Sequence, residues 1–187
     1  VSRNAFYMHD SISKKQWGFF EPTANLGIEL YNKTLGIFGL GRIGLELAMK
    51  CKAAYNMPVI YHNRKPNKEA EKILGAKYVS FDELLTESDV ISVHANLSDQ
   101  TREIFNKDAF SKMKHSATFI NTARGGLHNE QDLTEALEHK KIWGAGLDVT
   151  NPEPMAWDNP LLNMRNVCVL PHIGSATIET RAKMAIT

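Results

Sequence analysis

The chain has 187 residues, its 22 Lys and Arg nearly balance its 21 Asp and Glu, and 43% of its residues are hydrophobic. That length suits one substantial domain with a core of its own, or one domain with an additional arm. Because the charges form no long basic stripe and the apolar runs are only as long as strands, we expect no binding to nucleic acid and no segment that spans a membrane.

Residues 1–33 differ from the rest of the chain. An aromatic cluster of Trp17, Phe19 and Phe20 lies shortly before Pro22. One interpretation is a helix that packs against its own domain. We favour an N-terminal helical arm or linker whose exposed aromatic side chains are buried against another subunit or an absent domain.

From residue 34 onward, segments typical of strands alternate with segments typical of helices. Strands are expected over residues 35–38, 59–61, 78–79, 90–94, 117–121, 144–148 and 167–170. Helices are expected over residues 43–55, 68–74, 82–87, 107–112 and 130–139, and Asn129 is a suitable N-cap for the last of them. This alternation predicts an α/β fold, a doubly wound parallel sheet covered by helices on both faces.

A glycine-rich turn, GLGRIG, connects the first expected strand to the first expected helix. Gly39 permits the sharp bend, Gly41 lets the backbone approach phosphate oxygens, and Gly44 allows close packing of helix on strand. The helix that begins near Arg42 and Ile43 presents free N–H groups and the positive end of its dipole to an anion. Glycines alone are a weak signal, but the strand before them and the helical spacing of apolar residues after them predict a Rossmann-type dinucleotide site.

The end of the second expected strand indicates which dinucleotide binds. A dinucleotide site usually carries Asp or Glu about twenty residues after the glycine turn, to bind the ribose hydroxyls. Here the strand continues into Asn63, Arg64 and Lys65, without an acid. Arg64 can bind a phosphate through two N–H groups and Lys65 adds a point charge, so we prefer NADP to NAD. An ordinary solvated basic loop is the alternative.

Polar side chains that suit catalysis follow the last three expected strands. They are Arg124, the acidic pair Asp148 and Glu153, and His172. Because the carboxyl ends of parallel strands border the ligand crevice, we expect these side chains to lie close together. Arginine can bind the carboxylate of a 2-oxo acid and polarise its carbonyl, histidine can give the proton, and glutamate can accept the other imidazole N–H. Each residue alone has an ordinary explanation as an ion pair or solvated loop, so the prediction depends on the combination.

The other histidines and the cysteines have less specific surroundings. We expect His9, His115 and His139, which lie in polar segments, to be solvated. We expect His62 and His94, which end strands, to lie near the adenine pocket. His128, in the loop after Arg124, is close enough in sequence to touch the substrate. Cys51 and Cys168 match no metal or redox spacing, so we expect two buried thiols in the reducing cytoplasm and no metal site.

These motifs, in this order, resemble those of the D-isomer-specific 2-hydroxyacid dehydrogenases over residues 20–187. The resemblance implies catalytic roles for Arg124, Glu153 and His172, with Asp148 near the nicotinamide carboxamide. It also implies further dinucleotide contacts after the central strands and beside the histidine, at Ala95, Asn96, Thr101, Thr122, Ala123 and Gly174. Two positions depart from the family pattern: Asn96 stands where many members have proline, and His128 where a small or aliphatic residue is common.

The segment over residues 146–154 looks most like the glyoxylate/hydroxypyruvate reductase branch, which commonly uses NADPH. In this family a split substrate domain surrounds the nucleotide domain, and here it is missing, so the chain looks like an excised piece that starts at Val1. The resemblance thus implies an arm over residues 1–33 that helps to form a homodimer, a dinucleotide-binding domain over 34–175, and the start of a returning helix over 176–187. Alternatives are an NAD-dependent D-lactate or D-3-phosphoglycerate dehydrogenase, or a dinucleotide-sensing corepressor on the same fold. A formate dehydrogenase is disfavoured because Glu153, and not an amide, would support His172.

Overall fold

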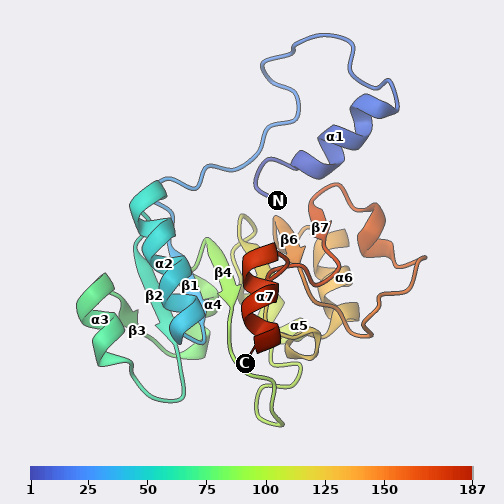
Figure 1. The fold of residues 1–187 in the computed structure, drawn as a ribbon. Helices are drawn as coiled ribbons and strands as arrows, with labels where there is room; N and C mark the ends of the chain where they lie inside the picture. Colours follow the sequence, from blue (N-terminus) through green and yellow to red (C-terminus); the bar gives the residue numbers. More distant parts are fainter. Residues whose placement is uncertain (187) are drawn as a thin grey trace.

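The computed structural model describes residues 1–186 and is built on a seven-stranded parallel sheet (Figure 1). The strands are β1 (Leu35–Phe38), β2 (Val59–His62), β3 (Lys77–Tyr78), β4 (Val90–Val93), β5 (Thr118–Asn121), β6 (Gly144–Leu147) and β7 (Val167–Val169). The helices are α1 (Ala5–Ser13), α2 (Arg42–Tyr55), α3 (Lys68–Leu74), α4 (Phe81–Glu87), α5 (Lys107–Lys112), α6 (Glu130–Glu138) and α7 (Ile178–Ile186), with short 3₁₀ turns η1 (Gly125–Leu127) and η2 (Pro160–Asn163). The strand order β3-β2-β1-β4-β5-β6-β7 confirms the doubly wound fold.

Helices pack on both faces of the sheet because successive side chains of a strand point in opposite directions. Leu35 and Ile37 of β1 belong to a buried cluster with Ala48 of α2 and Leu74 of α3. Phe38, at the end of the same strand, belongs to a larger cluster with side chains from α4, α5 and α6. The sheet is therefore a buried layer, as continuous apolar strands predict.

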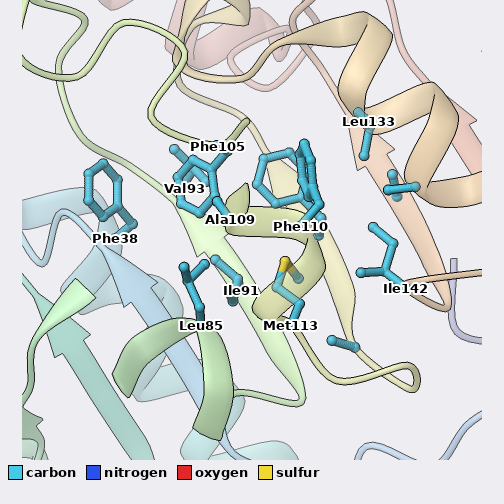
Figure 2. Packing of buried hydrophobic residues seen from close by; sticks show 14 of the residues in the cluster. Phe38, Leu85, Ile91, Val93, Phe105, Ala109, Phe110, Met113, Leu133 and Ile142 are labelled. Carbon is cyan, nitrogen blue, oxygen red and sulfur yellow. The ribbon is translucent and has the colours of Figure 1, made fainter. Parts of the chain in front are cut away.

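The larger cluster is rich in aromatic rings, several of which appear in Figure 2. The ring centroid of Phe105 lies 5.2 Å from that of Phe38 and 5.0 Å from that of Phe119. The Phe110 and Phe119 rings are perpendicular, with centroids 5.3 Å apart. Such edge-to-face pairs each contribute about 0.5–1.5 kcal/mol beyond their burial. They hold β1 and β5 in place, and the candidate site lies beyond the carboxyl ends of these strands.

The expected elements between residues 35 and 170 are all present, and their bounds differ from the expected ones by no more than one residue. Local signals explain this accuracy. Asn67, Ser80, Asn106 and Asn129 each cap a helix by accepting a hydrogen bond from a backbone N–H of its first turn. Gly75 ends α3 in the left-handed conformation, at φ 65°.

Helix α1 of the N-terminal arm lies above the sheet, and a long loop leads from it back to β1 (Figure 1), whereas Val1 lies against Gly144 and Gly146 of β6. No residue of α1 is buried, and Trp17, Phe19 and Phe20 are 68%, 78% and 81% exposed. Helix α1 does contact the domain at its edge, where Arg165 Cζ lies 5.6 Å from the centroid of the Tyr7 ring. The expected burial of the aromatic cluster against another subunit or an absent domain stays a prediction. The arm touches the domain through a few contacts, such as the hydrogen bond from Arg165 Nη2 to Asn25 Oδ1 at 2.6 Å.

Helix α7 also remains exposed along its length, whereas Thr187, the last residue of the expected helix, lies outside the described residues. Within residues 1–186, no helix is both long and apolar enough to cross a membrane. Cys51 and Cys168 are free thiols. Both are half-buried, whereas full burial was expected. Cys51 lies at the rim of the α2 cluster, and Cys168 lies on β7, the edge strand of the sheet. Partial burial raises the pKa of both thiols.

Candidate active site

The glycine turn lies at the topological switch point of the sheet, where β1 has β2 on one side and β4 on the other. Gly39 has a φ of 97°, which side chains disfavour, and a Cβ there would come within 2.5 Å of the backbone nitrogen of Ala95. A Cβ on Gly44 would lie 2.9 Å from the carbonyl oxygen of Gly39. Both glycines therefore allow close backbone contact, as expected from the sequence.

The N-terminus of α2 has the features of an anion site. Gly41 precedes it and is exposed, and a Cβ at this residue would meet no atom within 4 Å. Within residues 1–186, no side chain caps α2, in contrast to α3, α4, α5 and α6, so the N–H groups of its first turn remain available. Arg42 and Ile43 in that first turn are exposed. These residues fit a dinucleotide pyrophosphate.

Asn63 supports the glycine turn from the neighbouring strand. Its Oδ1 accepts a hydrogen bond from the backbone nitrogen of Leu40 at 2.6 Å, and its Nδ2 donates to the Leu40 carbonyl oxygen at 3.3 Å. Asn67 Nδ2 donates to the same oxygen at 3.0 Å, a contribution that the sequence analysis missed. The Asn63 amide is thus occupied by the turn itself, and its expected contact with the dinucleotide stays a prediction.

Arg64 and Lys65 follow Asn63 directly and are exposed. Neither side chain forms a hydrogen bond or ion pair within the described part of the chain. Because Asn63 is hydrogen-bonded to the glycine turn, these two unpaired cations follow directly after a residue that contacts that turn. No acid of the same loop would repel a phosphate there.

The loop after β4 forms the other side of the crevice. Thr101 Oγ1 donates to the Asn96 carbonyl oxygen at 2.8 Å and accepts from the backbone nitrogen of Ser98 at 2.8 Å. Thr101 therefore maintains the shape of this loop, while Asn96 is exposed. His94 is hydrogen-bonded to Ser92 through Nε2 at 2.9 Å, and burial lowers its pKa.

His62 is held by the residues around it. Its ring stacks on Phe38 and Tyr78, with centroids 5.9 and 6.1 Å away, and its Nδ1 lies 2.9 Å from the Val79 carbonyl oxygen. The expectation that His62 and His94 line the adenine pocket stays a prediction.

A buried amide organises the segment that carries Arg124. Asn121 Oδ1 accepts a hydrogen bond from the Ala123 nitrogen at 3.0 Å, and its Nδ2 donates to the Arg124 carbonyl oxygen at 2.9 Å. The Arg124 side chain is exposed, and its Nη1 donates to the Ala123 carbonyl oxygen at 2.6 Å. Thr122 is exposed and Ala123 half-buried, and their expected contacts with the dinucleotide stay predictions. No role for Asn121 is expected from the sequence, although a polar residue at the end of a buried strand is a usable signal.

The acidic segment lies against the arginine segment. A side chain at Gly125 would overlap the carbonyl oxygen of Thr150, so only glycine permits this approach. Thr150 Oγ1 donates to the Pro152 carbonyl oxygen at 2.8 Å, and the Thr150 nitrogen donates to Glu153 Oε2 at 3.3 Å. These bonds fold the segment so that Glu153 Oε1 remains available for His172.

His172 and Glu153 form a short polar pair, with His172 Nδ1 2.6 Å from Glu153 Oε1. The hydrogen bond from His172 is the main cause that lowers the pKa of the Glu153 carboxyl, and the positive charge of Arg124 lowers it further. Glu153 is therefore a carboxylate, and His172 Nδ1 is the donor. The structure thus brings Glu153 and His172 together, as the sequence predicted. The expected approach of Arg124 to this pair and the catalytic roles of all three residues stay predictions.

Asp148 holds the loop that contains His172. Its Oδ1 accepts from the Ile173 nitrogen at 2.8 Å and its Oδ2 from the Gly174 nitrogen at 2.7 Å. A Cβ on Gly174 would come within 2.9 Å of that carboxylate. His172 has a φ of 54°, in the left-handed region, and the Asp148 bonds stabilise this conformation. The expected contact of Asp148 with the nicotinamide carboxamide stays a prediction.

His128 does not reach the crevice. Its side chain is 0% exposed, so the expectation that it could touch the substrate is wrong. The residue pairs with Phe105 through the backbone and packs its ring against that of Phe119, on the core side of η1. His9, His115 and His139 are exposed, as expected.

Known proteins are similar to this chain over most of its length. A family model described as the NAD binding domain of D-isomer specific 2-hydroxyacid dehydrogenase matches residues 1–174. Over 184 residues the chain is 43% identical to glyoxylate/hydroxypyruvate reductase B of Salmonella agona (strain SL483). The matched region covers 98% of this chain and 57% of that protein.

Two solved structures are similar over nearly the whole chain. A glyoxylate reductase from Paecilomyes thermophila has a TM-score of 0.88 and 42% identity, covering 99% of this chain and 55% of that one. D-lactate dehydrogenase with NAD+ from Lactobacillus jensenii has a TM-score of 0.84 and 32% identity, covering 98% and 58%. The chain thus spans little more than half the length of these relatives. It belongs to the D-isomer-specific 2-hydroxyacid dehydrogenase family and contains that family's NAD-binding domain.

Proposed function

We propose that the protein containing this chain reduces a small 2-oxo acid to the corresponding 2-hydroxy acid, with glyoxylate or hydroxypyruvate as the substrate. The observation that carries the proposal is the His172–Glu153 pair, 2.6 Å apart and within the electrostatic influence of Arg124. An acid, its carboxylate partner and an arginine at one end of a dinucleotide-binding sheet suit carbonyl reduction. The name of the 43% identical relative supports the choice of substrate.

Each side chain has a separate task in this reaction. The Arg124 guanidinium binds the substrate carboxylate through parallel N–H groups and orients the carbonyl. His172, held at Nδ1 by Glu153, gives the proton from Nε2 to the carbonyl oxygen. A bound dinucleotide would supply the hydride that the carbonyl carbon receives.

For the coenzyme we propose NADP. The unpaired cations Arg64 and Lys65, directly after Asn63, would bind the 2′-phosphate, and the loop lacks the acid that binds ribose hydroxyls in NAD sites. NAD is the second candidate, because the D-lactate dehydrogenase that resembles this chain was solved with NAD+.

We further propose a homodimer in which the arm packs against the second copy, since Trp17, Phe19 and Phe20 form an exposed aromatic cluster. The cytoplasm is the proposed location, where the free thiols of Cys51 and Cys168 would remain reduced.

Steady-state kinetics of the full-length protein test the proposed reaction, with glyoxylate, hydroxypyruvate, pyruvate and 3-phosphohydroxypyruvate, each with NADPH and NADH. We expect turnover of the first two substrates with NADPH. His172→Ala removes the proton donor and should lower kcat by about 100- to 10,000-fold while dinucleotide binding stays intact.

Equal turnover by the wild type and His172→Ala would contradict the assignment of the acid. A preference for pyruvate with NADH would favour the D-lactate alternative. Dinucleotide binding without turnover of any of the four substrates would contradict the reductase proposal and favour a dinucleotide sensor on the same fold.

A further inference from the structure

His128 is a buried titratable residue that the proposed reaction does not use. Its ring is fully enclosed, with the Phe119 ring centroid 5.7 Å away. Nδ1 lies 3.0 Å from Asn121 Nδ2, while Nε2 has no hydrogen-bond partner among the described residues. Among the described residues, the contact of Nδ1 with Asn121 is thus the only hydrogen bond of this side chain.

The bonds of Asn121 determine which nitrogen of His128 carries the proton. Asn121 Oδ1 accepts from the Ala123 nitrogen, so the amide oxygen faces Ala123 and the amide nitrogen faces Arg124 and His128. An amide nitrogen only donates, so His128 Nδ1 must accept, and its proton lies on Nε2. A protonated ring would place two N–H groups against each other.

Burial also favours the neutral form of the His128 ring. The enclosed site lowers the pKa of His128 to about 4, because a charged ring would lose its hydration. The ring is therefore neutral at neutral pH and keeps a free acceptor at Nδ1.

His128 and the Arg124 main chain share one donor group. The two N–H groups of Asn121 Nδ2 divide between the Arg124 carbonyl oxygen at 2.9 Å and His128 Nδ1 at 3.0 Å. Without His128 Nδ1, one N–H of a buried amide would have no partner, and the amide would be free to turn away from Arg124.

We propose that His128 is a positioning residue for substrate binding: Nδ1 fixes the Asn121 amide, and the amide holds the main chain at Arg124. The part about substrate rests on the proposed function, since Arg124 there binds the substrate carboxylate. The hydrogen-bond chain itself does not depend on that function.

Two variants of the full-length protein distinguish the effect of losing the Nδ1 acceptor from the effect of changing the packing at residue 128. His128→Leu keeps an apolar group of similar size but removes the acceptor, whereas His128→Asn can place Oδ1 where Nδ1 was. We expect His128→Leu to raise the KM for the 2-oxo acid about tenfold, with the dinucleotide Kd unchanged within about twofold. His128→Asn should restore most of the KM, and His115→Leu, at an exposed histidine, serves as the control.

The inference is overturned if His128→Leu leaves KM unchanged, or if His128→Asn impairs KM as much as His128→Leu does. The unchanged dinucleotide Kd verifies that each variant is folded. A wild type that turns over no 2-oxo acid would contradict the proposed function and not the hydrogen-bond chain.

Nitrogen NMR of histidine-labelled full-length protein tests that chain without any substrate. We expect a His128 ring with the proton on Nε2, an accepting Nδ1, and no titration between pH 5 and 8. A proton on Nδ1 at neutral pH, or titration in this range, would overturn the assignment.

Discussion

At the residue scale, the charges around His172 determine what the site can do. The pKa of Glu153 is lowered from its ordinary value of 4.5, chiefly by the hydrogen bond with His172, so the side chain remains a carboxylate to a lower pH than an ordinary glutamate. A lowered carboxyl pKa means that this pair stabilises the folded chain at neutral pH and loses its contribution as the pH falls through the lowered value. Both side chains are nearly half exposed, so solvent weakens the effect. The pair therefore contributes little to the stability of the fold, and its proposed role is in proton transfer.

The choice of coenzyme also rests on single side chains. Arg64→Asp replaces a cation that can bind the 2′-phosphate with a group that repels it and can bind ribose hydroxyls. We expect the NADPH Kd to rise by about 10- to 100-fold and the NADH Kd to stay within about twofold. Titration of the full-length wild type and variant with each coenzyme measures these two Kd values.

Lys141→Asp makes the same charge change at an exposed residue before β6, at the opposite end of the sheet, and should affect neither coenzyme. An NADPH affinity that does not respond to Arg64→Asp would remove the argument for NADP.

At the scale of elements, α2 differs from the other helices around the sheet by its free N-terminus. Gly41→Ala adds a methyl group where the structure has open space, at a φ of −95° that alanine accepts. We expect the melting temperature to change little and the dinucleotide Kd to rise at least tenfold, because the methyl group would occupy the path of the pyrophosphate.

Gly44→Ala is the matched comparison in the same helix. Its methyl group would lie 2.9 Å from the Gly39 carbonyl oxygen and 3.0 Å from the Ile37 side chain. We therefore expect this variant to lose about 1–3 kcal/mol of folding stability. Unchanged dinucleotide binding by Gly41→Ala would show that the anion binds elsewhere.

The loops that carry the site are held by long-range contacts. Gly125 touches Thr150 from another segment, and Glu130 accepts hydrogen bonds from the Asn151 nitrogen at 3.2 Å and from Asn159 Nδ2 at 2.6 Å. The N-terminal turn of α6 thereby holds the acidic segment from two sides. Sequence motifs identify the reactive residues, but these contacts set their positions.

At the scale of the whole molecule, the arm is the feature that a single copy does not explain. An exposed aromatic cluster of this kind is typical of an interface. Trp17→Ser combined with Phe20→Ser should convert a dimer of the full-length protein into a monomer, as measured by sedimentation or light scattering. Trp157→Ser is the control, because Trp157 is 96% exposed but lies outside the arm. A double variant that stays dimeric would contradict the proposed role of the arm.

The sequence by itself determined the order of strands and helices, the glycine turn and the three polar segments. These depend on local signals: apolar periodicity, caps such as Ser80 and Asn129, and glycines at a turn. It also predicted the pairing of Glu153 with His172, because the ends of parallel strands must meet at one edge of the sheet.

Only the tertiary structure decided which polar residues support the site from within. Asn63 is bound to Leu40, 23 residues earlier, and Asp148 to the loop after His172, 25 and 26 residues later. His128 follows Arg124 closely in sequence, yet it is buried beneath the loop while Arg124 lies at the surface. The direction in which a loop side chain points depends on what packs against it, and no local pattern contains that information.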